Sequence, residues 1–316
     1  MMSSAAAPPA RRIAVLVPCY NEEQTVGSVV RDFRAALPGA RVYVYDNNSR
    51  DQTAARAREA GAIVRTERMQ GKGNVMRRMF SDIEADLYVL VDGDATYHAP
   101  SAPAMIAKLL EEHLDMVVGT RLTSHQGEAF RRGHYLGNRM LTGFVSLLFG
   151  RQLTDMLSGY RVMSRRFVKS FPALAKGFET EIELTVHALE LRLPAAELAT
   201  PYGNRPAGSE SKLSTYRDGL RILLTIISLF KEERPLSFFT ILFALLAATS
   251  LALAAPIFVT YMETGLVPRF PTAILATGIM LLAFLSLVCG LILDTVTLGR
   301  REMKRLHYLA IAAPDE

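Results

Sequence analysis

The sequence predicts an α/β domain built on a mainly parallel sheet, followed by a hairpin of two membrane-spanning helices. Short apolar runs alternate with segments of helical spacing from residue 13 to residue 118, a pattern typical of a parallel sheet with helices on both faces. Polar residues and glycines gather where several of these runs end. Beyond Pro235, two long runs contain no charged residue.

The α/β part begins with a strand and a helix whose ends are marked by proline. Residues 13–17 form an apolar run that ends before Pro18, and residues 25–37 have helical spacing and stop before Pro38. The following elements repeat this alternation. We expect strands at residues 41–45, 62–66, 87–91 and 116–118, and helices at residues 52–60, 74–85 and 102–114.

Each uncharged run is long enough to cross a bilayer. The runs cover residues 236–261 and 270–293, and a spanning helix needs about 20 apolar residues. Lys and Arg gather before the first run and after the second, whereas the connector of residues 262–269 carries one acidic and one basic residue. Since positive flanks stay inside, we expect a multi-pass protein of the cell (inner) membrane, with both termini and the α/β domain cytoplasmic.

These observations divide the chain into four segments. Residues 1–11 are expected to be a flexible tail without the apolar core of a signal peptide. The α/β domain follows at residues 12–213. Residues 214–235 carry apolar side chains at helical spacing and are expected to form an amphipathic helix at the membrane surface. Residues 236–316 then contain the hairpin and a cytoplasmic tail.

Charge and cysteine content narrow the class of protein. The net charge of +5 is accounted for by the positive flanks of the spans, and no nucleic-acid-binding motif accompanies it. No nucleic-acid partner is therefore expected. The two cysteines, Cys19 and Cys289, fall in different segments and fit a reducing compartment.

The segment Asp92-Gly93-Asp94 follows the apolar run at residues 87–91. Ligands of open α/β sheets bind beyond the carboxyl ends of the strands. Paired carboxylates suit a hard cation such as Mg²⁺ or Mn²⁺, which can hold a diphosphate. The alternative is a simple turn, since Asp and Gly are turn residues.

Several short motifs occur in a distinctive order along the α/β part. They are Val17-Pro18-Cys19-Tyr20-Asn21-Glu22-Glu23, Asp46-Asn47-Asn48-Ser49, Gly71-Lys72-Gly73-Asn74, Asp92-Gly93-Asp94, Asp155-Met156-Leu157-Ser158-Gly159-Tyr160-Arg161 and Arg205-Pro206-Ala207-Gly208-Ser209. In this order the first four resemble the GT-A fold, a Rossmann-like fold, of family 2 glycosyltransferases. The last two resemble the membrane-anchored polyprenyl-phosphate glycosyltransferases, a group that includes the dolichol-phosphate mannose synthases.

The resemblance implies a nucleotide-sugar site in the first loops. Proline and tyrosine would pack against the base and ribose, acidic side chains would accept hydrogen bonds, and a lysine would meet a phosphate. For Asp46, a cap on the following turn is the alternative. The residues expected to bind the donor are Pro18, Tyr20, Glu22, Asp46, Lys72, Asp92 and Gly93.

The resemblance makes Asp92 and Asp94 the ligands of Mg²⁺ or Mn²⁺. Related mannose synthases often add a Gln after the Asp pair, and Thr96 stands at that position here. The third protein ligand is therefore left open, with His98 as a weak candidate.

The resemblance also implies a polyprenyl phosphate of the undecaprenyl or dolichyl type as acceptor. Arg suits an anionic phosphate because it binds it bidentately; a solvated surface or an anionic-lipid contact is the alternative. The residues expected to contact the lipid phosphate are Arg121, Arg131, Arg132, Arg205 and Lys212.

Three residues are expected to be catalytic: Asp94, Asp155 and Arg121. Asp155 would orient a hydroxyl or help to deprotonate the acceptor. Glu181 and Glu183 fit the start of a helix, where acidic side chains are favoured, and receive little functional weight.

The function predicted from the sequence is an inverting, metal-dependent transfer of a sugar from a UDP- or GDP-sugar to a polyprenyl phosphate. The resemblance also implies a homo-oligomer assembled through the spans, as in membrane-anchored relatives. Two alternatives are a processive polysaccharide synthase and a non-catalytic flippase subunit or scaffold. The synthase signature contains Trp, which this chain lacks, and a scaffold has no need of paired carboxylates beside nucleotide loops.

Overall fold

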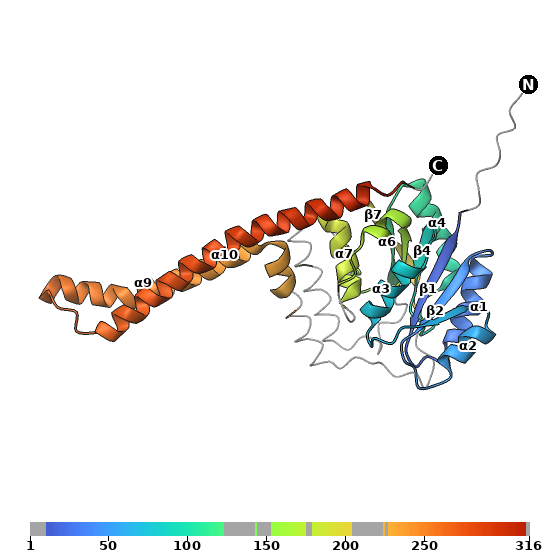
Figure 1. The fold of residues 1–316 in the computed structure, drawn as a ribbon, viewed down its shortest axis with the longest axis horizontal. Helices are drawn as coiled ribbons and strands as arrows, with labels where there is room; N and C mark the ends of the chain where they lie inside the picture. The colour runs from blue at the N-terminus through green and yellow to red at the C-terminus, as the bar shows by residue number, and fades with distance from the viewer. Residues whose placement is uncertain are drawn as a thin grey trace, which may run out of the picture. The chain divides into compact units, whose positions relative to one another are not determined.

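The computed structural model describes residues 11–122, 143, 153–174, 179–203, 224 and 227–313. The chain divides into two compact units, one of residues 1–220 with 304–316 and one of residues 221–303. The first unit contains the α/β domain, and the second contains the long apolar helices (Figure 1).

The α/β unit is built on a seven-stranded sheet with the strand order β3-β2-β1-β4-β6-β5-β7. Only β6 is antiparallel to its neighbours within this sheet, and the other strands run in one direction. The predicted mainly parallel sheet is therefore confirmed. The strands are β1 (Ile13–Cys19), β2 (Arg41–Asp46), β3 (Ile63–Thr66), β4 (Leu87–Leu90), β5 (Met116–Leu122), β6 (Arg161–Ser164) and β7 (Ala195–Pro201).

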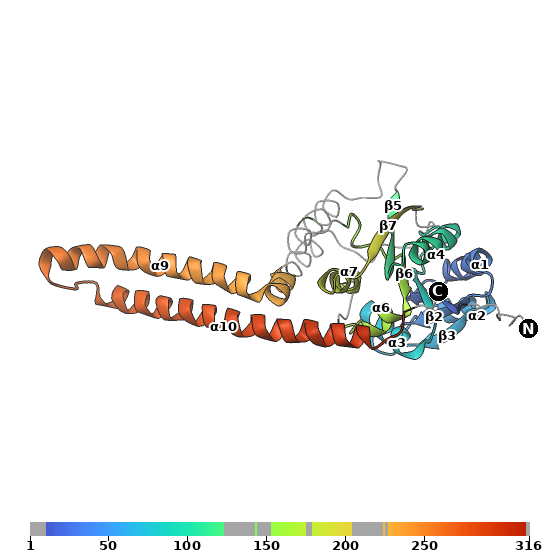
Figure 2. The ribbon, with the colours of Figure 1, turned by 90° about the horizontal axis from the view of Figure 1, so that it is seen from above.

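Helices cover both faces of this sheet. The helices α1 (Val26–Ala36), α2 (Thr53–Glu59) and α4 (Ala102–Glu111) contribute to the core on one face. The helices α3 (Lys72–Asp82), α6 (Arg165–Ser170) and α7 (Thr180–Glu190) form the core on the other, as the view in Figure 2 shows for α4 and α3. A short 3₁₀ helix, η1 (Ala99–Ser101), precedes α4.

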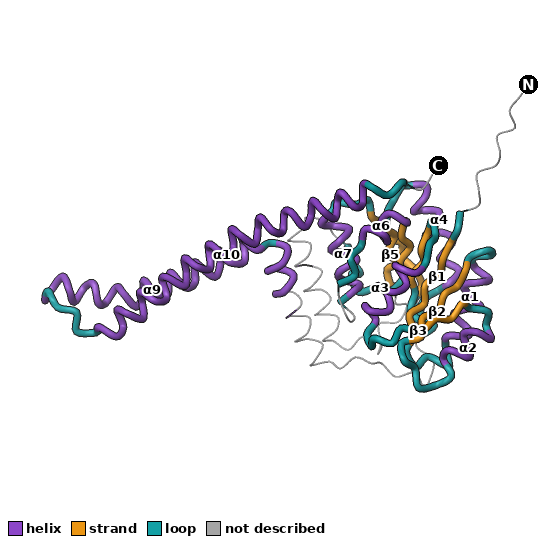
Figure 3. Tube along the Cα trace, in the orientation of Figure 1, coloured by secondary structure: helices purple, strands orange, loops and turns teal. Residues whose placement is uncertain are grey.

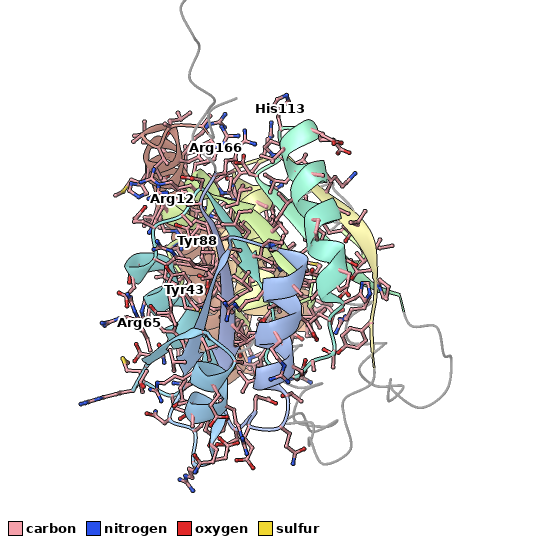
Figure 4. The ribbon with its side chains drawn as sticks, turned by 90° about the vertical axis from the view of Figure 1, so that its right-hand side faces the viewer. Arg12, Tyr43, Arg65, Tyr88, His113 and Arg166 are labelled. Carbon is pink, nitrogen blue, oxygen red and sulfur yellow. The ribbon has the colours of Figure 1, made fainter. Side chains whose placement is uncertain are left out.

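The central strands have apolar side chains on both faces, as expected for a sheet covered by helices. In β1, Val15 and Val17 pack with α1 and α4, whereas Leu16 packs with α3. Tyr43 and Tyr88 add aromatic rings to the α3 face (Figure 4). Both faces of these strands are buried because each strand contributes side chains to the hydrophobic core on either side of the sheet.

The sequence predicted the elements up to β5 with boundaries shifted by a few residues (Figure 3). The largest shift in a strand is that of β5, which extends to Leu122 rather than ending at Val118. The later elements β6, α6, α7 and β7 were not predicted.

The carboxyl ends of the parallel strands meet at one edge of the sheet. Figure 4 labels Arg12 at the start of β1 and Arg65 near the end of β3, so this edge is the lower one in that view. Because β6 runs in the opposite direction, the loop that precedes it also arrives at this edge. The carboxyl ends of the parallel strands β1, β2, β3, β4, β5 and β7 and the described residues before β6 therefore lie at one edge of the sheet.

The second unit contains α9 (Pro235–Thr264) and most of α10 (Phe270–Leu309), two helices long and apolar enough to cross a membrane. They pack together through small side chains: Ser250 Oγ donates to the Ala276 carbonyl at 2.7 Å, and a Cβ at Gly290 would lie 2.8 Å from Phe239 Cβ. The predicted pair of C-terminal apolar helices is confirmed. Most of the predicted amphipathic helix lies outside the described residues, although residues 227–233 are helical.

Candidate active site

Two carboxylates, Asp92 and Asp94, directly follow β4 at the carboxyl edge of the sheet. The Asp94 side chain is buried, and its Oδ1 accepts hydrogen bonds from the backbone N–H of Thr96 at 3.2 Å and from the Thr96 hydroxyl at 2.6 Å. The Asp92 side chain is 28% exposed and reaches solvent. Thr96, at the position of the expected Gln, therefore orients the Asp94 carboxylate.

The backbone around Asp92 is packed too closely for side chains at two glycines. A Cβ at Gly159 would overlap the Asp92 carboxylate, and a Cβ at Gly93 would lie 2.6 Å from Cys19 Sγ. The Gly93 carbonyl also accepts a hydrogen bond from the Thr25 hydroxyl at 2.7 Å. Packing therefore requires both glycines, independently of any contact that Gly93 makes with a donor.

Asp46 ends β2 and lies beside Cys19 of β1 in the sheet register. Its Oδ2 accepts from the Ser49 backbone N–H at 3.3 Å, which is the turn cap considered as the alternative role. Its Oδ1 is buried and has no hydrogen-bond partner among the described residues. A buried acceptor without a donor is unfavourable, so this oxygen fits a ligand that supplies an N–H or O–H.

The loop after β1 lies beside Asp46. Pro18, Tyr20 and Glu22 are each partly exposed there. The Glu22 backbone N–H donates to the Thr53 hydroxyl at 2.8 Å, and the Thr25 hydroxyl lies 3.3 Å from Glu22 Oε2. The structure therefore brings the predicted donor residues of β1 and β2 to the same edge.

Asn47 holds the loop that leads to Lys72. Its Nδ2 donates to the carbonyls of Glu67 at 2.9 Å and Met69 at 2.8 Å, and its Oδ1 accepts from the Gly71 N–H at 2.7 Å. Gly71 has a φ of 128°, a conformation that favours glycine. This loop delivers Lys72 to the site as the first residue of α3.

Lys72 lies between two carboxylates. Its Nζ is 2.5 Å from Asp92 Oδ1 and also pairs with Glu181 Oε1. Burial opposes the charged ammonium, but the two carboxylates outweigh it and hold the pKa of Lys72 above its ordinary value. Lys72 is therefore a charged group at the predicted diphosphate site.

Arg121 and Asp155 form a bidentate ion pair. The Nε and Nη2 atoms of Arg121 each lie 2.7 Å from an oxygen of Asp155. Burial opposes the charge on Arg121, but the hydrogen bonds to Asp155 raise its pKa above the ordinary value. The sequence analysis assigned Arg121 to the lipid phosphate and Asp155 to a substrate hydroxyl or to the deprotonation of the acceptor; in the structure the two side chains pair with each other.

Arg161 is a buried residue that the sequence left without a role. Its guanidinium donates to the carbonyls of Ser158 at 3.0 Å and Met156 at 2.8 Å, and its Nη2 also donates to the Glu181 carbonyl at 3.0 Å. Burial lowers the pKa of Arg161 to about 10, so it remains charged near neutral pH. Arg161 thus ties the loop before β6 to the first turn of α7.

The other predicted site residues divide into four that lie outside the described residues and His98, which is described. Arg131, Arg132, Arg205 and Lys212 lie outside the described residues. His98, the candidate third metal ligand, has an exposed side chain whose Nδ1 lies 3.0 Å from Ser101 Oγ. Within the described residues, no three His, Cys, Asp or Glu side chains are grouped to hold a metal.

Asp92 and Asp94 still fit a divalent cation. Carboxylate oxygens are ligands that Mg²⁺ and Mn²⁺ prefer, and Mg²⁺ usually takes one or two carboxylates and completes its ligands with water and phosphate oxygens. The two carboxylates of Asp92 and Asp94 would therefore match the number of protein ligands that a diphosphate-bound Mg²⁺ usually takes.

Residues 14–171, half of the chain, match the model of glycosyl transferase family 2. The chain belongs to glycosyl transferase family 2. Glycosyltransferase AglJ of Haloferax volcanii is 31% identical over 299 residues, covering 94% of this chain and 98% of AglJ. The dolichyl-phosphate hexose transferase of the same organism is 28% identical over 222 residues, covering 70% of this glycosyltransferase and 95% of that protein.

Solved structures share the fold of this glycosyltransferase. Glucosyl-3-phosphoglycerate synthase from Mycobacterium tuberculosis superposes with a TM-score of 0.57 at 25% identity, over 70% of this chain and 80% of that one. That structure holds Mn²⁺, uridine diphosphate and glucosyl-3-phosphoglycerate. The predicted family and GT-A fold are thereby confirmed, and sugar transfer follows from the family.

Proposed function

We propose that this glycosyltransferase moves a sugar from a UDP- or GDP-sugar to a polyprenyl phosphate, with inversion and with Mg²⁺ or Mn²⁺. The observation that carries the proposal is the Asp92–Asp94 pair at the strand edge of a chain that also has two helices of bilayer length. The pair suits a metal-bound diphosphate, and the helices suit an enzyme whose acceptor resides in a membrane.

The donor side is supported by the loops after β1, β2 and β4. Asp46 Oδ1 supplies a buried acceptor without a protein donor among the described residues, as a base or ribose requires. Lys72 supplies a cation beside Asp92 for the diphosphate. The Mn²⁺ and uridine diphosphate in glucosyl-3-phosphoglycerate synthase agree with this assignment.

The acceptor side is supported by the helices and by the relatives. A chain anchored by α9 and α10 would hold its catalytic domain beside a membrane lipid, and the dolichyl-phosphate hexose transferase is named for such an acceptor. Basic residues gather before the first span and after the second, and positively charged flanks stay on the cytoplasmic side of a membrane. We therefore place the catalytic domain and both termini on the cytoplasmic face. A homo-oligomer remains a prediction.

The reaction needs positioned charge more than a strong base, because a lipid phosphate is already anionic. A phosphate oxygen attacks the anomeric carbon, and the bond from that carbon to the diphosphate breaks. The nucleoside diphosphate leaves with the electron pair. A bound metal supplies positive charge to the diphosphate. Lys72 adds charge next to it, and Asp155 holds the Arg121 guanidinium in one orientation.

The test uses the full chain purified in detergent, with UDP- and GDP-sugars, undecaprenyl phosphate and Mg²⁺ or Mn²⁺. We expect mass spectrometry to detect a glycosylated polyprenyl phosphate that disappears when a chelator removes the metal. A parallel reaction contains 3-phosphoglycerate in place of the lipid. Transfer to 3-phosphoglycerate without transfer to the lipid would overturn the proposed acceptor.

A further inference from the structure

Glu181 occupies a built position beside the site. It lies in the first turn of α7, and its side chain is 4% exposed. Its Oε1 pairs with Lys72 Nζ, and its Oε2 is buried without a hydrogen-bond partner among the described residues. An ordinary helix-start carboxylate is solvated, so this burial needs another reason.

The surroundings of Glu181 fix it in place. Arg161 donates to the Glu181 carbonyl at 3.0 Å and to the Thr185 hydroxyl at 3.0 Å, one turn further along α7. The same guanidinium holds the loop of Met156 and Ser158, which leads to Gly159 against Asp92. The buried Arg161 guanidinium therefore holds both the start of α7, which carries Glu181, and the loop that packs against Asp92.

The charge around Lys72 is the key quantity. One ammonium is shared by two carboxylates, those of Asp92 and Glu181. If Glu181 were neutral, Asp92 would be the one charged carboxylate left of the two that pair with Lys72 among the described residues. Asp92 would then be a poorer ligand, because a cation and an ammonium would compete for one carboxylate.

We propose that Glu181 is a positioning residue that shares the Lys72 charge and so leaves Asp92 available to a metal bound with the donor diphosphate. This inference rests on the metal-dependent function proposed above and adds a residue that acts through Lys72. The position of Glu181 also keeps the Lys72 ammonium at the carboxyl edge of the sheet, where a phosphate would lie.

The experiment measures Mn²⁺ binding to the full chain in the presence of UDP, and of GDP in a second arm, by the electron paramagnetic resonance signal of free Mn²⁺. We expect Glu181→Gln to weaken Mn²⁺ binding by about tenfold, the low end of the effect of outer-shell residues on metal affinity, because Glu181 reaches the metal ligand Asp92 only through Lys72. Glu183→Gln is the matched control two residues along α7; its carboxylate instead accepts from the Leu174 backbone N–H at 2.9 Å. Glu181→Asp should restore part of the affinity.

A double-mutant cycle separates positioning from a general charge effect. If Glu181 acts through Lys72, Glu181→Gln has little effect on Mn²⁺ binding in a Lys72→Met background. An equal loss in both backgrounds would mean that Glu181 attracts the metal directly, and the proposal would be wrong. Because Lys72→Met with Glu181→Gln removes one charge of each sign, this pair remains informative if Glu181→Gln alone fails to fold.

The outcomes also separate this inference from the proposed function. Mn²⁺ binding with a nucleotide needs no lipid, so a failure of lipid transfer leaves the measurement intact. Wild-type binding that is unchanged in Glu181→Gln overturns the inference alone. Absence of Mn²⁺ binding to the wild type with either nucleotide overturns both the inference and the metal dependence of the proposed function.

Discussion

The regions beside the ends of β4 and β5 each contain a buried cation, but they balance its charge in different ways. At the end of β5, Arg121 forms a bidentate pair with Asp155, one charge of each sign. Beside the end of β4, Lys72 of α3 pairs with two carboxylates among the described residues, those of Asp92 and Glu181. Two carboxylates around one ammonium favour the binding of a further cation. A bidentate pair of one cation and one carboxylate instead holds both side chains in one orientation. This difference supports the metal site proposed at Asp92 and the orienting role proposed for the Arg121–Asp155 pair.

The largest expected effect comes from the region after β4. Asp92→Asn keeps the shape of the side chain but removes charge from the metal site, and we expect kcat/KM to fall by about 10³-fold. The control is Asp32→Asn on the exposed surface of α1. Steady-state kinetics at saturating Mn²⁺ measure the difference, and a variant with wild-type activity would refute the metal role of Asp92.

The next effect tests the bidentate pair at the end of β5. Asp155→Asn leaves the Arg121 guanidinium, 16% exposed, without its carboxylate, and we expect a loss of about 3 kcal/mol in the free energy of unfolding. Replacing both residues, with Arg121→Met and Asp155→Leu, should recover most of that stability without recovering activity. Equal destabilisation by the single and double variants would show that the pair has no special geometry.

His187 is a buried ionisable group whose pKa shift has no contribution from an acidic side chain among the described residues. It lies between Phe167 and Phe171, its Nε2 is 3.1 Å from Ser170 Oγ, and burial together with the positive charge of Lys304 lowers its pKa to about 3. The folded pKa lies below the unfolded value of about 6.5. The stability that the folded state gains by keeping His187 neutral is therefore fully present above pH 6.5 and is lost as the pH falls toward 3.

Between pH 7 and pH 5 the cost of keeping His187 neutral should reach roughly 2 kcal/mol. Thermal unfolding of the full chain at both pH values measures it, with His187→Gln as the variant that cannot titrate. We expect the melting temperature of the wild type to fall further on acidification than that of the variant. Parallel decreases would place the acid sensitivity in other groups.

The sequence was most informative where structure and chemistry are local. The strands from β1 to β4 were predicted because apolar runs fill both faces of a covered sheet, and the Asp92–Asp94 pair was found because it follows one of these runs. β6 was missed because it has four residues and begins with Arg161, a charge that argues against a buried strand.

The pairings in the site could not be predicted in the same way. Arg121 and Asp155 were both identified, but their bond depends on the reversed direction of β6, which brings the preceding loop to the edge of β5. The sequence pattern around Glu181 is that of a solvated helix start, and only the position of α7 in the fold shows that Glu181 pairs with Lys72. Residues distant in sequence meet only through the topology, and no local pattern encodes that contact.

The smallest expected effect concerns Thr96, whose hydroxyl donates to Asp94 Oδ1 at 2.6 Å. Thr96→Val keeps the volume of the side chain but removes this donor, and a hydrogen bond to a charged group contributes about 1.5 kcal/mol. We expect about a tenfold loss of activity together with a weaker response to Mn²⁺, because Asp94 would lose its fixed orientation. Thr96→Ser retains the hydroxyl and should keep most of the activity. If Thr96→Val and Thr96→Ser behave alike, the hydroxyl does not orient Asp94, and the two-carboxylate site depends on the backbone N–H of residue 96 instead.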